Sequence, residues 1–343
     1  MPNAIITGTG FFVPPRIVTN DDLVTEFGVE TSHEWIHQRT GIEQRHFAEE
    51  GVGGVELAVP AAQMAIAAAG LRPCDIDMIL YATLSPRHVF PGDGVYLQAA
   101  LGMPEGPDAK FVPALDIRNQ CSGFLYGLAT ATSMVQSGRI KHVLLVGAEC
   151  HSHALDLSTE GRTVGSLFGD GAGAVIVSAT DEDRGVRGWW LGADGRHADA
   201  LAQRVFDTRR TSFVPKNDAG EGIIAAEDMY ATMNGRLVYK HAVEKMMSVL
   251  MQACAEQHIE LSDIDLFVFH QANMRINQQV QAKLGLPDEK VVHNIQRYGN
   301  TTAATIPILL AETVRDGRLK PGMKVACVAF GAGFTWGAAL IDW

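Results

Sequence analysis

Short apolar runs alternate with amphipathic segments along the whole chain. The clearest amphipathic segment is 240–257, where apolar residues recur every three or four positions and form one face of a helix. The apolar runs are short and rich in Val, Ile, Leu and Phe, which is typical of buried strands. Together these patterns predict an α/β protein. The strands that we expect are 76–83, 142–148, 172–178, 266–270, 324–330 and 338–341.

The two halves of the chain contain similar segments in the same order. Residues 74–77 (Cys-Asp-Ile-Asp) and 262–265 (Ser-Asp-Ile-Asp) each lead into an apolar strand. Residues 137–141 and 316–320 both contain Gly-Arg, end a predicted helix and precede another strand. Two pairs of similar segments in one order indicate an internal repeat.

The repeat predicts where chemistry can occur. Alignment of the similar segments places Cys121 opposite Asn300, each just before a predicted helix. Equivalent loops of two packed halves meet in one crevice, at the carboxyl ends of their strands. His270 ends a predicted strand, so we expect Cys121, His270 and Asn300 to converge in that crevice.

The same reasoning divides the chain in two. We expect an N-terminal half, 1–178, that carries the cysteine, and a C-terminal half, 179–343, that carries the histidine and the asparagine. The segment at about 193–233 lacks a helical or strand period. It is predicted to be an irregular excursion, of the kind that shapes the entrance to an active site.

The composition is that of an ordinary globular protein. The chain has 343 residues, of which 47% are hydrophobic and 20% are charged, so a large core is expected. Its formal net charge of -11 disfavours binding to nucleic acid or to anionic membranes. We find no pattern of a signal peptide or a transmembrane helix. The five cysteines lack metal-site spacing, which predicts reduced thiols in a cytoplasmic protein and no metal site.

Cys121 is the candidate nucleophile. It precedes a predicted helix at 122–135, and the N-terminus of a helix lowers the pKa of a nearby thiol. The small residues Ser122 and Gly123 let the backbone pass close to a substrate. The alternative is a buried cysteine that acts as a small hydrophobic residue. We keep that interpretation for the other four cysteines, Cys74, Cys150, Cys254 and Cys327.

His270 and Asn300 each have a structural alternative. A histidine at the end of a strand is often a core residue with a satisfied hydrogen bond, and an asparagine before a helix is often its cap. The two amide donors of Asn300 would also stabilise an oxyanion, as would a backbone N–H in the glycine-rich turn 331–333. The glycine-rich segment 169–173 favours a structural turn over a phosphate loop, because a strand and not a helix follows it.

At these residues the chain resembles the β-ketoacyl-acyl-carrier-protein synthase III family of the thiolase superfamily. The resemblance covers nearly the whole chain, and its strongest segments are 35–42, 121–124, 168–173, 270–276, 299–301 and 330–337. It implies a duplicated thiolase-like fold, layered α-β-α-β-α with two mixed sheets, in an obligate homodimer. It also implies Cys121, His270 and Asn300 as the catalytic set, with the backbone N–H groups of Cys121 and Ala332 holding the oxyanion.

The resemblance further implies binding residues. Trp35 would stack on the adenine of coenzyme A, with Arg39, Thr40 and Arg162 nearby. Phe90 would close the acyl pocket of the neighbouring subunit. Two segments, 118–120 and 233–236, depart from the usual pattern of the family, which bears on the choice of acyl chain. The docking patch for an acidic acyl carrier protein would contain Lys240, Arg275 and Lys283.

The expected reaction is a decarboxylative condensation. An acyl-CoA starter would load Cys121, and a malonyl thioester, expected on acyl carrier protein, would extend it to a β-ketoacyl thioester in fatty-acid initiation. Coenzyme A thioester is the substrate, and no cofactor is expected. Alternatives are an acyl-CoA condensing enzyme of secondary metabolism that makes a long-chain ketone, quinolone or polyketide, and a binding protein that has lost catalysis. A papain-like Cys-His-Asn hydrolase is disfavoured, because the papain Cys-Gly-Ser-Cys-Trp pattern is absent.

Overall fold

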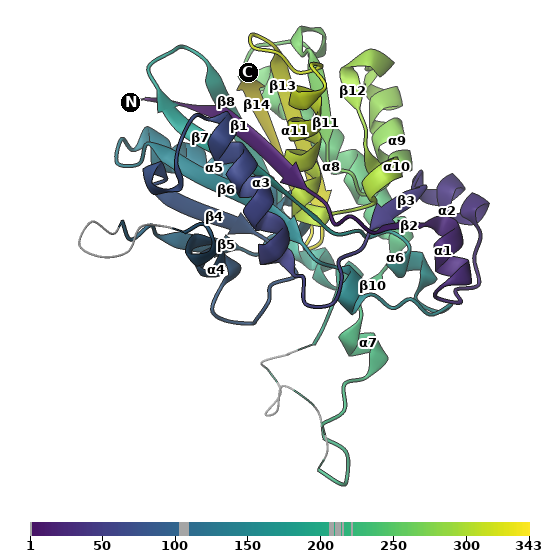
Figure 1. Cartoon of the computed structure of the whole chain (residues 1–343). Helices are drawn as coiled ribbons and strands as arrows, with labels where there is room; N and C mark the ends of the chain where they lie inside the picture. The colour runs from purple at the N-terminus through teal and green to yellow at the C-terminus, as the bar shows by residue number, and fades with distance from the viewer. Residues whose placement is uncertain (1, 103–109, 206–208, 210–213, 215, 221) are drawn as a thin grey trace.

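The computed structural model describes the chain except residues 1, 103–109, 206–208, 210–213, 215 and 221. Two five-stranded mixed sheets lie face to face, with helices between them and on both outer faces (Figure 1). The layers therefore alternate α-β-α-β-α, and the predicted layered α/β architecture is confirmed.

The two sheets have the same topology. In each, three neighbouring strands are parallel and the remaining two pair antiparallel. This correspondence is the structural form of the repeat in the sequence. The first sheet has the order β1 (Asn3–Phe12), β7 (Gly171–Thr180), β6 (His142–Glu149), β4 (Met78–Ala82) and β5 (Ala114–Ile117). The second has the order β12 (Val291–Val292), β11 (Leu266–Phe269), β13 (Lys324–Gly331), β14 (Thr335–Asp342) and β8 (Gly185–Ala193).

Two helices fill the space between the sheets. They are α5 (Gly123–Gln136) and α11 (Thr305–Arg315), and both bury apolar residues against strands of either sheet. Each ends before a glycine at positive φ, Gly138 after α5 and Gly317 after α11, the two glycines of the repeated Gly-Arg pattern. Strand β7 approaches α11 so closely that a Cβ on Gly173 would lie 2.6 Å from the nitrogen of Ile308. Only glycine allows this packing.

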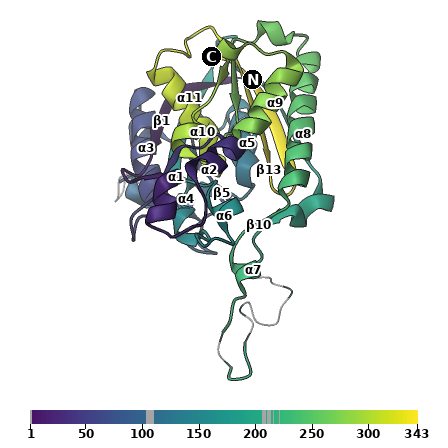
Figure 2. The same cartoon turned by 90° about the vertical axis from the view of Figure 1, so that its right-hand side faces the viewer.

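The outer helices cover the outer faces of the sheets. α3 (Gly54–Ala68) packs on the first sheet, and α8 (Gly235–Glu256) packs on the second beside α9 (Met274–Leu284) (Figure 2). The predicted helix 240–257 corresponds to α8, except that its last residue, Gln257, directly follows the end of α8. Among the described residues, no helix is both long and apolar enough to cross a membrane. Shorter helices and strands of the body are β2 (Ile17–Thr19), β3 (Gln44–His46), α1 (Asn20–Thr25), α2 (His33–Thr40), α4 (Asp93–Ala100), α6 (Arg162–Gly165) and α10 (Ile295–Tyr298).

The predicted excursion at 193–233 leaves the body after β8. It contains a 3-10 turn, η4 (Gly195–Ala200), then β9 (Leu201–Ala202), α7 (Ala226–Met229) and β10 (Thr232–Met233). β9 pairs with β10, so the segment starts and returns at one place on the body. The described residues between them, which include α7, project outward (Figures 1 and 2). Residues 206–208, 210–213, 215 and 221 of this predicted excursion lie outside the described residues.

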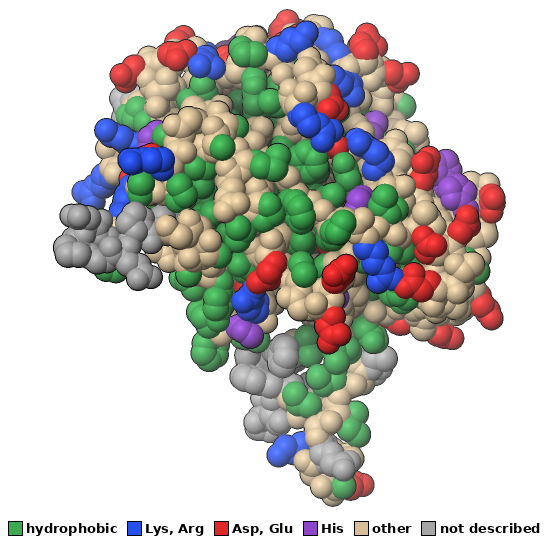
Figure 3. Space-filling view, viewed as in Figure 1, with side chains coloured by type: hydrophobic (Ala, Val, Ile, Leu, Met, Phe, Trp, Pro, Cys, Tyr) green, Lys and Arg blue, Asp and Glu red, His purple; other side chains and the backbone are tan. Residues whose placement is uncertain are grey.

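The surface is divided by chemical character. Figure 3 shows acidic side chains gathered over α1 and α2, and hydrophobic side chains at the lower edge near α4. Phe90 is 83% exposed and Phe111 is 89% exposed, which is unusual for large aromatic residues. Three further apolar residues of α4, β5 and the loop before α4 are also exposed: Val89, Val95 and Leu115.

Candidate active site

Cys121 lies in a 3-10 turn, η2 (Gln120–Ser122), that joins β5 to α5. Gln120 has φ 46°, in the left-handed region that side chains rarely adopt, so the turn is tight. The Cys121 side chain is 7% exposed. The end of β13 packs against this turn, because a Cβ on Gly331 would lie 2.7 Å from the Cβ of Cys121. The turn 331–333 and the cysteine therefore form one structural unit.

The electrostatics of Cys121 differ from the prediction. Burial, together with the smaller effect of the Glu149 carboxylate, raises the pKa of the Cys121 thiol to about 12. The backbone N–H groups of Ala332 and Cys121 lower this pKa, but they do not outweigh burial. The predicted lowering of the pKa by the helix is therefore wrong for the resting protein, because desolvation of the charged form dominates. The two N–H groups nevertheless interact with the sulfur.

Glu149 is a residue that the sequence pattern did not single out. It ends β6 and is fully buried. Its carboxylate accepts hydrogen bonds from the Thr83 hydroxyl and the backbone N–H groups of Leu84 and Ser85, as well as from Ala303 N–H at 3.4 Å. A charged residue at the end of an otherwise apolar strand was the available signal, since a buried carboxylate needs several donors.

His270 follows β11 directly and is 2% exposed. Its backbone N–H donates to Val328 O at 2.8 Å, and its ring Nδ1 lies 2.6 Å from Thr305 Oγ1. Burial lowers the pKa of His270 to about 3, so the imidazole is neutral. Within the described part of the chain, its Nε2 is buried and has no hydrogen-bond partner. His270 therefore does not match the alternative of a core histidine with all of its hydrogen bonds satisfied, because its Nε2 has no partner among the described residues.

Asn300 is 5% exposed and precedes the turn η7 (Thr302–Ala304), which leads into α11. Its Oδ1 accepts a hydrogen bond from Thr302 N–H at 2.9 Å. The residue is therefore not the N-cap of α11, which is Ala304. Since the amide oxygen is occupied, the Nδ2 end is the one left for a ligand.

The structure brings the loops of the three predicted residues together. A Cβ on Gly123, next to the Cys121 turn, would lie 3.5 Å from the Cβ of Ala303 in η7. His270 joins the same place through its contact with Thr305. Burial keeps both the Cys121 thiol and the His270 imidazole in their neutral forms. This is the opposite of the thiolate–imidazolium pair of a papain-like hydrolase.

Trp35, Arg39 and Arg162 form a second group, on the surface. Arg39 lies 4.4 Å and Arg162 5.5 Å from the Trp35 ring centroid, within the range of cation–π interaction. Arg162 also donates to Glu30 O at 2.7 Å. Thr40 is different, because its buried hydroxyl donates to Ile36 O and accepts from Ile42 N–H at the end of α2. Its hydroxyl is therefore occupied within the helix terminus.

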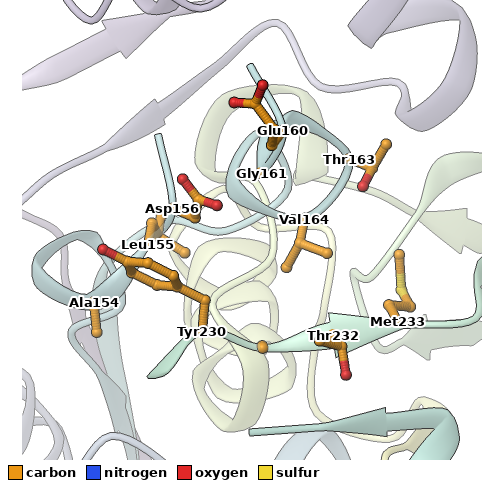
Figure 4. A pocket seen from close by; sticks show the side chains of 11 residues that line it. Ala154, Leu155, Asp156, Glu160, Gly161, Thr163, Val164, Tyr230, Thr232 and Met233 are labelled. Carbon is orange, nitrogen blue, oxygen red and sulfur yellow. The ribbon is translucent and has the colours of Figure 1, made fainter. Parts of the chain in front are cut away.

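A cavity of about 320 Å³ opens beside this group (Figure 4). One wall is the segment 160–164 with Val164, and the other is the returning end of the excursion with Tyr230 and Met233. Met233 also belongs to the apolar cluster that contains Trp35. The excursion thus helps to form a cavity next to Arg162. Asp156 and Glu160 give the lining a negative character, which does not suit a phosphate group.

The remaining predicted residues lie on the surface or in turns. Lys240 on α8 and both Arg275 and Lys283 on α9 are exposed. Asn234 belongs to segment 233–236, which differs from the usual pattern of the family. It caps α8 by accepting a hydrogen bond from Leu237 N–H. The segment 169–173 leads into β7, and its buried Asp170 accepts hydrogen bonds from three backbone N–H groups, of Ala48, His151 and Ser152. Among the described residues, no cluster of His, Cys, Asp or Glu fits a metal ion.

Comparison with known proteins agrees with this architecture. Two family models match, 3-oxoacyl-[acyl-carrier-protein] synthase III over residues 115–195 and the C-terminal model of the same name over 254–343. The 3-oxoacyl-[acyl-carrier-protein] synthase III of Aquifex aeolicus VF5 is 38% identical, over 99% of this chain and 100% of that one, with a TM-score of 0.86. The Thermus thermophilus β-ketoacyl synthase III is 37% identical over 99% of both chains, also with a TM-score of 0.86. A priming β-ketosynthase of the R1128 polyketide pathway is 28% identical over 99% and 96% of the two chains, with a TM-score of 0.86.

Proposed function

Because the chain belongs to the 3-oxoacyl-[acyl-carrier-protein] synthase III family of condensing enzymes, we propose that it extends an acyl-CoA starter by decarboxylative condensation with a malonyl thioester. The family resemblance, the duplicated thiolase-like fold and the acyltransferase class expected from the sequence are confirmed. The starter, the extender and the residue roles are our proposal.

In the first half-reaction, Cys121 becomes acylated. Its sulfur attacks the carbonyl carbon of acyl-CoA and the bond from that carbon to the CoA sulfur breaks. The thiol proton leaves with coenzyme A, so the products are an acyl-cysteine and a free thiol. The N–H groups of Ala332 and Cys121 hold the carbonyl oxygen while it is negatively charged. The same donors already lower the pKa of the thiol.

In the second half-reaction, the malonyl thioester loses carbon dioxide and its electron pair becomes an enolate. His270 Nε2 and Asn300 Nδ2 donate hydrogen bonds to the enolate oxygen. The enolate carbon attacks the acyl-cysteine, the carbon–sulfur bond breaks, and the released Cys121 thiolate takes a proton from solvent water. The observation that carries this proposal is the His270 Nε2, a buried polar atom that has no hydrogen-bond partner among the described residues. The mechanism uses no metal or redox cofactor.

Coenzyme A would bind at the surface group described above. We propose that the adenine stacks on Trp35, that Arg162 and Arg39 contact its phosphates, and that Thr40 only supports the end of α2. Acyl carrier protein is acidic, and the exposed cations of α8 and α9 are the surface that would attract it. These cations are Lys240, Arg275 and Lys283.

We also propose that the enzyme is a homodimer. The outer edge of β5 ends the first sheet, and large apolar side chains are exposed around it. Such an edge is a surface on which a second copy can pair. Phe90 would then reach the acyl pocket of the neighbouring subunit. We place the enzyme in the cytoplasm, where Cys121 stays reduced.

A secondary-metabolic condensing enzyme is the second candidate. The similarity to a priming β-ketosynthase of a polyketide pathway favours it. The departures from the family pattern at 118–120 and 233–236 bear on the choice of acyl chain and so fit a different starter. In this case the reaction at Cys121 is the same, but the starter or the extender differs.

Mass spectrometry of the intact protein tests the proposal. We expect exposure to an acyl-CoA panel of graded chain length to add one acyl group, located on Cys121 by peptide mapping. Addition of malonyl carrier protein should then remove the adduct and yield a β-ketoacyl product. Removal by malonyl-CoA alone would favour the second candidate. No adduct with any acyl-CoA would contradict both.

A further inference from the structure

Among the described residues, the ring of His270 has one side-chain partner, and that partner controls which ring nitrogen carries the proton. Nδ1 lies 2.6 Å from the Thr305 hydroxyl, while Nε2 is buried without a partner in the described residues. A neutral imidazole carries one proton, on either Nδ1 or Nε2. The direction of the hydrogen bond with Thr305 therefore decides whether Nε2 donates or accepts.

The hydrogen bonds around Thr305 indicate that direction. Its hydroxyl has one proton and two neighbouring acceptors, Thr302 O at 3.0 Å and His270 Nδ1 at 2.6 Å. Thr302 O already accepts from the backbone N–H of Thr305. If the hydroxyl donates to Thr302 O, it must instead accept a proton from Nδ1. Donation to Nδ1 is favoured because that contact is the shorter one, Thr302 O keeps its backbone donor, and Nδ1 has no other donor among the described residues. Donation to Nδ1 leaves the ring proton on Nε2.

The same turn orients the second donor. Thr302 N–H donates to Asn300 Oδ1 at 2.9 Å, which leaves the amide nitrogen as the free end. Thr302 has φ 48°, in the left-handed region. Its hydroxyl lies 2.7 Å from His151 Nε2, and this side-chain contact helps to hold the turn in place. Both donors of the proposed condensation are thus held by the segment that runs from Thr302 to Thr305.

We propose that Thr305 is a positioning residue that holds His270 in the tautomer with the proton on Nε2. In this tautomer His270 donates to an enolate oxygen and does not take the proton of Cys121. Loss of the Thr305 hydroxyl should therefore slow condensation and spare acylation. The inference rests on the proposed function for its kinetic consequence, but the tautomer itself can be measured without any substrate.

The test compares three variants with the wild-type protein. Thr305→Val keeps the branched shape and removes the hydroxyl, and Thr305→Ser keeps the hydroxyl. Thr313→Val is the matched control, because Thr313 is also a buried α11 threonine, but its hydroxyl donates to Leu309 O and Leu310 O. Cys121 acylation and the condensation rate are measured separately, and the tautomer is measured by NMR of ¹⁵N-labelled histidine, with His270 assigned by its loss in His270→Ala.

We expect the wild-type protein and Thr305→Ser to carry the His270 proton on Nε2. Thr305→Val should lose this preference and condense about tenfold more slowly, with acylation unchanged, since one hydrogen bond that sets the donor is lost. Thr313→Val should do neither. A wild-type proton on Nδ1, condensation by Thr305→Val at the wild-type rate, or equal loss of both half-reactions would overturn the proposal. Absence of acylation in the wild-type protein would instead contradict the proposed function and leave the NMR result as the test.

Discussion

The two turns that precede the central helices occupy corresponding places in the two halves but have different chemistry. Both contain a non-glycine residue in the left-handed region, Gln120 at φ 46° and Thr302 at φ 48°. The first turn carries a thiol whose charged form is opposed by burial and by Glu149. The second holds neutral hydrogen-bond donors. Under the proposed function, the first half would hold the acyl group and the second half would stabilise the charge of the enolate.

The largest effect on the first turn is expected from removal of the thiol. Cys121→Ala should abolish the acyl adduct completely, because the N–H groups of Ala332 and residue 121 are directed at the sulfur that this variant lacks. Cys327→Ala is the control, since Cys327 is also fully buried and burial also raises its pKa to about 12. Mass spectrometry after exposure to acyl-CoA measures both. An adduct that survives in Cys121→Ala would remove the first turn from the mechanism.

A second change tests the contact between β13 and the first turn. Gly331→Ala should slow acylation by about a hundredfold, because the added Cβ pushes the turn that carries Ala332 N–H away from the sulfur. The rate of adduct formation is the measurement. Gly195→Ala is the matched control, since a Cβ there meets nothing within 4 Å. Equal acylation rates in both variants would show that the turn does not serve the carbonyl oxygen.

The pH dependence of thiol alkylation tests the charge state of Cys121. Because its pKa is raised to about 12, the thiolate fraction should increase about tenfold per pH unit up to about pH 9.5, without levelling off. An ordinary thiol levels off above about pH 8.5. Iodoacetamide labelling, read by peptide mapping, gives the rate. A plateau near neutral pH would mean that the helix and the N–H groups outweigh burial.

The smallest effect concerns Glu149, the carboxylate beside the first turn. Glu149→Gln should lower the pKa of Cys121, since one cause of its rise is removed, and speed alkylation severalfold at a fixed pH. Glu312→Gln is the control, because Glu312 is another buried glutamate and bonds to Asn294 and Tyr298 instead. Slower or unchanged labelling in a folded Glu149→Gln protein would contradict the electrostatic argument.

Much of this arrangement could be predicted from the sequence. The apolar runs gave the strands near the site, such as β6 and β13, and the repeated Gly-Arg patterns gave the correspondence of α5 and α11. Strand β1 was not among the predicted strands, because glycines interrupt its apolar pattern. Those glycines serve packing, since a Cβ on Gly8 would lie 2.1 Å from Ala65 O of α3. The same applies to β8, where Trp190 and Trp336 cover Gly188 and Gly192.

The electrostatics of the site could not be predicted in this way. The position of Cys121 before a helix was visible, but its pKa depends on burial and on Glu149, which is distant in sequence. The contact of Thr305 with His270 also joins residues far apart in the chain. Local pattern locates the reactive residues, whereas their protonation depends on tertiary neighbours.

A single-turnover experiment with His270→Ala tests whether the first half holds the acyl group while the second stabilises the enolate. The variant is loaded with acyl-CoA, the Cys121 adduct is quantified, and a malonyl thioester is then added. We predict that the adduct forms at nearly the wild-type rate and then persists, because enolate formation lacks its donor. Consumption of the adduct at the wild-type rate, or failure of the adduct to form in the folded variant, would contradict the account.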